Sequence, residues 1–337
     1  MPTDIEQLAT ANSLVFFGSS DLNLASESTA LHLWLDSKKN ASMTFLQKNT
    51  NLRLNPADIF EGAKSALVFG LNYNRGLKKS NLVTPQIAQY AVIKDYHRVI
   101  SQKLALVAET LKVAGDVKDF VICVDTKPVL ERALARKTGA GFIGKNTCFI
   151  HYKYGSYYLL GTIITDSEQL SINTEETTPK SSCGTCRRCQ VYCPTGALNE
   201  NYKLDSNLCL SYWTIENRGL IPFVFWKHLR SFWYGCDLCQ MVCPFNRKAA
   251  LSSEKKLALD QIPLIKIALM TQAEYEVFFA GTALTRAKIY GLQRNALIAM
   301  FVSDDPQTQK AATLALGSAF SVVSQTASEI LQKMKEN

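Results

Sequence analysis

The sequence has no long apolar run and no recognisable amino-terminal targeting signal. No uninterrupted apolar segment approaches the roughly 18–20 residues that span a bilayer. The first residues include Asp4 and Glu6 and no basic cluster, so we expect no signal peptide. We therefore expect a cytoplasmic protein that makes no contact with a membrane.

The composition also lacks the biases of disordered and fibrous proteins. The chain has 337 residues, of which 47% are hydrophobic and 20% are charged, as in ordinary globular proteins. At about 100–200 residues per domain, this length predicts two or three domains. Lys and Arg number 37 against 29 Asp and Glu, which gives a formal net charge of +8.

Ten cysteines stand out against this ordinary composition. In a reducing compartment, clustered cysteines more often bind metal than form disulfides. Eight lie in or between two runs: Cys183-x2-Cys186-x2-Cys189-x3-Cys193-Pro194, the single Cys209, and Cys236-x2-Cys239-x3-Cys243-Pro244. The first spacing is that of bacterial ferredoxins, in which the fourth cysteine ligates the other cluster.

Counting four ligands for each cluster divides the eight cysteines into two sets. We predict one [4Fe–4S] cluster on Cys183, Cys186, Cys189 and Cys243, and a second on Cys193, Cys209, Cys236 and Cys239. Structural zinc is the alternative, but all-cysteine zinc sites more often show separate C-x2-C pairs. Cys123 and Cys148 lie in strand-like apolar runs, and we interpret them as small buried hydrophobic side chains.

Hydrophobic periodicity predicts an α+β protein with three domains. Strand-like runs at 65–71, 120–124, 148–152 and 157–164 alternate with helical periodicity over 96–111 and 128–137. The polar stretch 167–182 predicts a linker. From residue 257 onward the pattern is helical, with Ala-rich segments at 284–300 and 309–331 that suit antiparallel, HEAT-like helix pairs. The predicted domains are 1–175, 176–250 and 251–337.

Asp125 links the predicted strand 120–124 to the predicted helix 128–137. An Asp in this position most often caps the helix by accepting backbone N–H bonds. A carboxyl at the end of a buried strand can also donate a proton if burial raises its pKa. Glu131 and Arg132, on the same helix, could orient a ligand or pair with each other.

The glycine-rich segment 139–146 (GAGFIGKN) nearly matches a phosphate loop. Asn146 replaces the hydroxyl that would bind Mg²⁺, and the segment follows a helix where a phosphate loop follows a strand. We therefore reject nucleotide hydrolysis. Two interpretations stay open: a plain helix-to-strand turn, or a turn that brings the backbone close to a ligand, with Lys145 and Asn146 as donors.

Basic residues alternate with aromatic ones in the second half of the chain. Trp213, Trp226 and Trp233 lie close together, and seven Lys and Arg residues against two acids lie between 217 and 256. This mixture suits an RNA whose bases stack on aromatic rings, or else a solvated surface around a packed core. A second basic stretch, with Arg286, Lys288 and Arg294, could follow a phosphate backbone.

Taken together, these motifs resemble the epoxyqueuosine reductase family of cobalamin-dependent enzymes, which complete queuosine in tRNA. The resemblance covers most of the chain, and the segments that carry it are 94–97 (KDYH), 125–132 (DTKPVLER), 141–146 (GFIGKN), 193–197 (CPTGA), 211–216 (SYWTIE), 234–240 (YGCDLCQ) and 294–296 (RNA). It implies a nitroreductase-like cobalamin-binding domain, a ferredoxin-like domain with both clusters, and a C-terminal helical HEAT-like module that binds tRNA. In this module the sequence shows only one clear helical repeat, so the C-terminal part is shorter than in the family pattern.

The resemblance also implies roles for individual residues. The carboxyl of Asp125 is the expected proton donor above the corrin ring. The expected cobalamin contacts are Arg53, Ala88, Asp125, Lys145, Asn146, Ser206, Tyr234 and Gly235. Trp213 is expected at the modified base, and the other expected tRNA contacts are Arg218, Arg286, Lys288 and Arg294.

The implied reaction is a two-electron reduction of the epoxide of epoxyqueuosine to the alkene of queuosine, at the wobble position of tRNA. The two clusters would relay electrons from an external donor of the flavodoxin or ferredoxin type, and we expect a monomer. One alternative is a corrinoid and iron–sulfur reductive dehalogenase that acts on a small molecule, although such enzymes are typically exported. The other is an electron carrier or RNA-binding module without catalysis, which leaves Asp125 and 144–146 unexplained.

Overall fold

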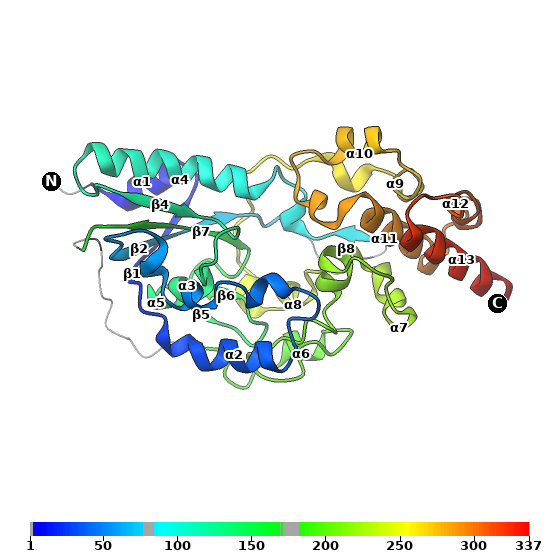
Figure 1. The fold of residues 1–337 in the computed structure, drawn as a ribbon, viewed down its shortest axis with the longest axis horizontal. Helices are drawn as coiled ribbons and strands as arrows, with labels where there is room; N and C mark the ends of the chain where they lie inside the picture. The colour runs from blue at the N-terminus through cyan, green and yellow to red at the C-terminus, as the bar shows by residue number, and fades with distance from the viewer. Residues whose placement is uncertain (1–2, 77–81, 83, 169, 171–181, 337) are drawn as a thin grey trace.

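An antiparallel sheet with the strand order β1-β2-β7-β4 forms the amino-terminal part of the protein (Figure 1). The computed structural model describes residues 3–76, 82, 84–168, 170 and 182–336. The strands are β1 (Val15–Asp21), β2 (Ser65–Asn72), β7 (Tyr158–Thr165) and β4 (Phe120–Cys123). The strands predicted at 65–71, 120–124 and 157–164 are confirmed. The sequence analysis missed β1, where a bulge between Phe16 and Gly18 interrupts the alternation.

Both faces of this sheet are covered, so its central strand is apolar on both sides. Along β2, Leu67 and Phe69 pack with α1 (Ile5–Ala11) and α4 (Tyr96–Val113), while Ala66 and Val68 face α5 (Glu131–Lys137). Helix α5 begins three residues later than predicted, because the chain after Asp125 first makes a turn through Pro128. The helix predicted over 96–111 is confirmed as α4.

Short elements connect the sheet to the cysteine-rich region. The predicted strand 148–152 is found as β6 (Phe149–His151), which pairs with β5 (Gly141–Ile143). Strand β3 (Gln86–Ile87) runs parallel to β8 (Phe232–Tyr234) and joins the first part of the chain to the cysteine region. The remaining short segments there are α6 (Arg188–Val191), η6 (Tyr212–Glu216), α7 (Phe223–Trp226), η7 (Lys227–Arg230), α8 (Leu238–Met241) and η8 (Pro244–Asn246).

The other short helical segments lie before and after this region. In the first part of the chain they are η1 (Ala25–Glu27), α2 (Ser28–Asp36), η2 (Thr44–Gln47), α3 (Thr50–Leu54), η3 (Pro56–Ile59) and η5 (Gln89–Ala91). The C-terminal part contains η9 (Ala258–Gln261), α9 (Leu264–Ala268), α10 (Gln272–Phe279), η10 (Ala283–Ala287), α11 (Lys288–Val302), α12 (Thr308–Ala315) and α13 (Ser321–Glu336). No helix in the described part of the chain is long and apolar enough to span a bilayer.

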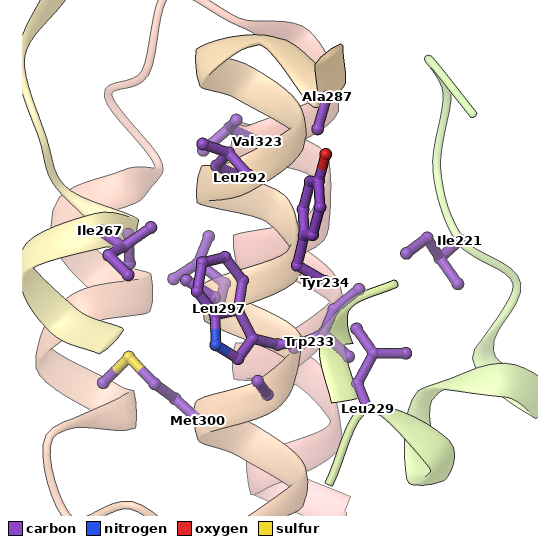
Figure 2. Close-up of a cluster of buried hydrophobic side chains, with 14 of the residues drawn as sticks. Ile221, Leu229, Trp233, Tyr234, Ile267, Ala287, Leu292, Leu297, Met300 and Val323 are labelled. Atoms are coloured by element: carbon purple, nitrogen blue, oxygen red, sulfur yellow. The ribbon is translucent and has the colours of Figure 1, made fainter. Parts of the chain in front are cut away.

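Helix α11 is the centre of the largest hydrophobic core. Residues 291–300 are all buried, and α9, α12 and α13 pack around them. Figure 2 shows Trp233 and Tyr234 of β8 among side chains of these helices, including Leu297 and Val323. The core continues from Ile87 to Ile330, so it crosses the predicted boundary at 250, while the boundary at 175 lies outside the described residues.

This core changes the interpretation of the aromatic cluster. Trp226, Phe232, Trp233 and Tyr234 are buried, so of the two interpretations the structure favours the packed core. They are buried because the C-terminal helices cover β8 and η7. Spacing along the sequence could not show this, since α11, which contacts both β8 and η7, begins more than fifty residues after β8.

Candidate functional site

Asp125 lies in the turn after β4 and presents an open carboxylate. Its backbone is left-handed (φ 55°), and its side chain is 66% exposed. The hydroxyl of Tyr96 donates to its Oδ2 at 2.9 Å. It does not cap α5. Instead, the backbone N–H of Asp125 donates to the carboxylate of Glu131, 3.1 Å and 3.2 Å away, which holds the turn against the start of that helix.

A histidine connects Asp125 to a second carboxylate. The Nε2 of His97 lies 3.3 Å from Asp125 Oδ2, and its Nδ1 lies 2.7 Å from Asp95 Oδ1. Asp95 also accepts the backbone N–H of His97 at the start of α4, at 3.0 Å. The N-terminal turn of one helix therefore holds the imidazole between two carboxylates.

These contacts control where a proton resides. The hydrogen bond with His97 lowers the pKa of Asp125, with a further contribution from Tyr96, although burial opposes the shift. Partial burial disfavours the imidazolium, but the hydrogen bonds to Asp125 and Asp95 outweigh it and raise the pKa of His97. The expectation that burial raises the pKa of Asp125 is therefore wrong, because its partners favour the carboxylate. The pair stores its proton mainly on His97.

Two arginines stand beside this acidic group. Arg53, on α3, and Arg286, on η10, both interact electrostatically with Asp125. Both arginines contact Phe45. The guanidinium of Arg53 donates to the Phe45 carbonyl at 3.5 Å, and the guanidinium of Arg286 lies 5.3 Å from the centre of the Phe45 ring. Positive charge from two distant parts of the chain therefore surrounds the Asp125 carboxylate.

Gly235, in the turn after β8, lies very close to Ala88, which directly follows β3. Ala88 donates its N–H to the carbonyl of Tyr234 at 2.8 Å, and a Cβ added to Gly235 would lie 2.6 Å from the Ala88 Cβ. Ala88, Ser206, Tyr234 and Gly235 are all buried. The predicted contacts of these four residues with cobalamin stay a prediction. The four residues form the packed layer behind the site, because β3 pairs with β8 there.

Lys145 and Asn146 belong to the first cysteine set. The side chain of Lys145 is buried, and its ammonium donates to the carbonyls of Gly184 and Cys186 at 2.7 and 3.1 Å. The backbone N–H of Lys145 donates to Cys183 Sγ. Asn146 lines the cavity between the cysteines. This ammonium holds the loop that carries the cysteines, and the expected cobalamin contact of Lys145 stays a prediction.

One cavity brings together the first predicted cluster set. It has a volume of about 140 Å³, and its lining includes Cys183, Cys186, Cys189 and Cys243 together with Asn146 and Arg188. The four thiols surround a space instead of meeting at a point. Among the described residues, no three His, Cys, Asp or Glu side chains are placed to hold a single metal ion.

The second predicted set also gathers in space. Cys193, Cys209, Cys236 and Cys239 are linked by electrostatic interactions among their thiols. Burial raises the pKa of Cys209 and of Cys236, so these thiols are protonated at neutral pH unless a metal binds them. Cys148, which we expected only to fill the core, is hydrogen-bonded to Cys239, whereas Cys123 is buried as expected.

Comparisons with known proteins address the same two regions. Residues 182–246 match the family described as "4Fe-4S double cluster binding domain", and residues 53–126 match "Epoxyqueuosine reductase QueG, DUF1730". The epoxyqueuosine reductase of Francisella cf. novicida (strain Fx1) is 33% identical over 316 residues, which cover 87% of this chain and 86% of the relative. This chain belongs to the epoxyqueuosine reductase family.

Solved structures of the epoxyqueuosine reductase family share the whole fold. The enzyme from Streptococcus thermophilus has a TM-score of 0.87 at 26% identity, covering 99% of this chain and 90% of that one. A structure described as epoxyqueuosine reductase with a tRNA-Tyr epoxyqueuosine-modified tRNA stem loop has a TM-score of 0.82 at 25% identity, covering 98% and 89%. The predicted mixed helix-and-strand fold and the iron–sulfur domain are thereby confirmed.

The structure separates the residues that we expected to contact tRNA. Arg294 is fully buried in α11 and donates to the carbonyls of Trp213, Asn217 and Gly219 at 2.9, 3.0 and 2.5 Å. Burial lowers the pKa of Arg294 to about 9. Its predicted contact with tRNA is wrong, because a sequence without nearby acids does not reveal that the helix is central.

The other four residues that we expected to contact tRNA differ in how exposed they are. Arg286 forms a bidentate ion pair with Glu216, with contacts of 2.8 and 2.7 Å. Arg218 is half-buried and donates to the carbonyl of Ile215, and the half-buried indole of Trp213 donates to Asn207. Lys288 is exposed. Of the basic stretch, only Lys288 and part of Arg286 can therefore reach a phosphate.

Sequence reasoning assigned no role to Tyr96 and His97, which complete the Asp125 site. A local signal was present. Asp95 directly before the periodic segment predicts a helix N-cap, and a histidine two residues later places its ring beside the capping carboxylate. What the sequence could not indicate is that Asp125 approaches the same ring from another strand.

Proposed function

We propose that this protein reduces the epoxide of epoxyqueuosine, in tRNA, to the alkene of queuosine. The observation that carries the proposal is that an acid pair and a predicted cluster ligand are joined by one chain of contacts. The hydroxyl of Tyr96 donates to Asp125, and the centre of the Tyr96 ring lies 6.1 Å from the centre of the Tyr90 ring. The side chain of Tyr90 is in turn hydrogen-bonded to Tyr234. Tyr234 and Gly235 lead directly into Cys236.

The cysteine sets suit two [4Fe–4S] clusters, one for each set predicted from the spacing. Four thiols around a cavity are the donor set that a cubane needs, whereas one zinc ion requires ligands that meet within bonding distance. The cavity of the first set is lined in part by the exposed Arg188, and Gly235 directly precedes Cys236 of the second set. When bound by these two cysteine sets, the clusters would supply one-electron carriers between an external donor and the Asp125 site.

Cobalamin fits the exposed polar groups of that site. Arg53 and Arg286 offer guanidinium donors for the amide side chains of a corrin ring, and both interact electrostatically with the exposed carboxylate of Asp125. Of the expected contacts, Arg53 and Asp125 would hold it. When bound, cobalamin supplies strongly reducing cobalt chemistry, while the protein supplies position and protons.

The proton chemistry follows from the hydrogen bonds. Reduction of an epoxide to an alkene consumes two electrons and two protons and releases water. His97, which holds a proton through its raised pKa, passes it to Asp125 Oδ2, and the exposed carboxyl of Asp125 then delivers it to the epoxide oxygen. Asp95 keeps the imidazole aimed at Asp125 throughout.

The test uses Asp125→Asn protein that carries its clusters and cobalamin. Asparagine keeps the size of the side chain but cannot deliver a proton, so we expect conversion of epoxyqueuosine tRNA to fall about 100-fold or more. Mass analysis of the released nucleosides measures the conversion, and the absorbance of clusters and corrin is the control. Conversion at the wild-type rate would remove Asp125 from the mechanism, and conversion of a halogenated compound instead would favour a dehalogenase.

A further inference from the structure

Helix α6 exposes a basic and apolar surface next to both cysteine sets. We call the exposed residues Arg187, Arg188, Val191 and Tyr192 the α6 surface. Val191 is 75% exposed and Tyr192 is 42% exposed, so two apolar side chains lie next to the two arginines on this surface. The helix lies between Cys189 and Cys193, one from each set. The surface is therefore attached directly to the predicted cluster ligands.

The first cysteine cavity opens beneath this surface. Arg188 lines the cavity beside Cys186 and Cys189, which are themselves partly exposed. On the inner side, Lys145 holds the loop through the carbonyls of Gly184 and Cys186. The lining of this cavity includes all four cysteines of the first set and none of the second. The cavity beside Arg188 therefore offers an electron from outside a route to the first set.

The charge around the opening has one sign. No Asp or Glu occurs between 182 and 199 or between 238 and 253. Arg247 and Lys248, both exposed, directly follow the segment of Phe245, which also lines the cavity. Within the described part of the chain, none of the four cationic side chains around the opening forms an ion pair with an acid. These four are Arg187, Arg188, Arg247 and Lys248. The positive charge is available to a partner from solution.

We propose that the α6 surface docks an acidic electron-carrier protein that donates one electron at a time to the first cluster. This rests on the proposed function, which needs two electrons for each epoxide. Each docked carrier loses one electron and is oxidised, and the first cluster gains that electron and passes it inward. Two encounters therefore supply one turnover. Short-lived redox complexes use small interfaces, with charge to speed the encounter and a few apolar contacts at the centre.

An acidic protein fits this surface better than RNA does. An RNA would draw its affinity from stacked bases and phosphate contacts, but the most exposed apolar side chain here is aliphatic Val191. In Figure 1, α6 lies at the lower side of the molecule, whereas α12 and α13 form the right-hand end. A carrier on α6 would leave the helical end of the protein accessible.

The test measures reduction of the clusters in the holoprotein without tRNA. Photoreduced flavodoxin is the acidic carrier, and titanium(III) citrate is a small reductant that needs no docking surface. We expect Arg187→Glu/Arg188→Glu to slow reduction by flavodoxin about 10-fold or more and to weaken its dependence on ionic strength. Reduction by titanium(III) citrate should be unchanged. Lys227→Glu/Arg230→Glu, an equal charge change at exposed residues of η7, is the matched control.

A second variant guards against damage to the cavity by the arginine substitutions. Val191→Asp leaves both arginines in place and should show the same selective loss with flavodoxin. Wild-type rates with flavodoxin in both variants would overturn the proposal, as would an equal loss with titanium(III) citrate in both. If the variants lost tRNA binding but flavodoxin still reduced their clusters at the wild-type rate, the surface would be assigned to RNA instead. Because no tRNA is present in the rate measurement, its failure would leave the proposed epoxide reduction untouched.

Discussion

At the residue scale, the decisive feature is the proton that Asp95, His97 and Asp125 share. Asp125 is ionised by its partners, so an acid at this position depends on a neighbour that can recharge it. His97 has a raised pKa and stays protonated to a higher pH than a free imidazole, for which the pKa is about 6.5. The rate should therefore fall as pH rises through the pKa of His97.

His97→Gln should move this limb of the pH profile to lower pH. Without the imidazolium, the only proton source is Asp125, whose pKa returns toward the ordinary carboxyl value of about 3.9. We expect a loss of about 10- to 100-fold at neutral pH and a smaller loss in acid. Single-turnover rates across pH measure it. His32→Gln, at an exposed histidine of α2, is the control, and an unshifted profile in His97→Gln would contradict the relay.

Arg294 is a structural residue despite its charge. Arg294→Met keeps the unbranched stem but leaves the carbonyls of Trp213, Asn217 and Gly219 without their donor. We expect the free energy of unfolding to fall by about 2–4 kcal/mol. Chemical denaturation of the holoprotein measures the loss. Lys310→Met, at an exposed lysine of α12, should change stability by less than about 0.5 kcal/mol. Equal effects of the two substitutions would refute the structural role.

At the scale of elements, the close approach of β3 and β8 decides the shape of the site. Gly235→Ala would bring a Cβ within 2.6 Å of the Ala88 Cβ, at a backbone φ of +67°. Gly281→Ala has a similar φ, +69°, with open space around it, so it carries only the backbone cost. We expect Gly235→Ala to be less stable than Gly281→Ala by about 1–3 kcal/mol, measured by denaturation. Equal losses would mean that the two strands can separate without cost.

The start of α11 contains the remaining candidates for phosphate binding. Lys288 is exposed, whereas Arg286 is paired with Glu216. Lys288→Gln should weaken tRNA binding and reduce the slope of log K against log salt by about 0.7–0.9 for each phosphate that the protein no longer neutralises. Arg286→Gln should change this slope much less. Binding titrations over a range of salt concentrations measure both, and an unchanged slope in Lys288→Gln would place the tRNA elsewhere.

At the scale of the whole molecule, the C-terminal helices act as a cover for the cysteine region. The core that contains Trp226 and Phe232 is completed by side chains from α9, α11 and α13. Figure 2 shows Trp233 of this core with Ile267 of α9, Leu297 of α11 and Val323 of α13. Deleting 251–337 would expose these aromatic residues. We expect the shortened protein to aggregate and to lose cluster absorbance. A deletion that starts at Met334, where the side chains are exposed, should keep both solubility and clusters. Retained clusters in the longer deletion would show an independent module.

The sequence by itself determined the chemistry of this protein. Cysteine spacing is a local property, so the two runs and Cys209 predicted the two cluster sets that the structure brings together. The strands at 65–71 and 157–164 and the helix at 96–111 were equally predictable, because each carries its own periodicity. The motif around Asp125 placed an acid after β4 for the same reason.

Only the tertiary structure decided which polar groups meet and which charges are buried. His97 comes from α4 and Asp125 from the turn after β4, and their contact reverses the expected direction of the Asp125 pKa. Arg294 looks like a phosphate contact in sequence but is enclosed by segments that lie far from it in the chain. Burial and long-range hydrogen bonds depend on packing, and packing joins residues whose separation in sequence carries no signal.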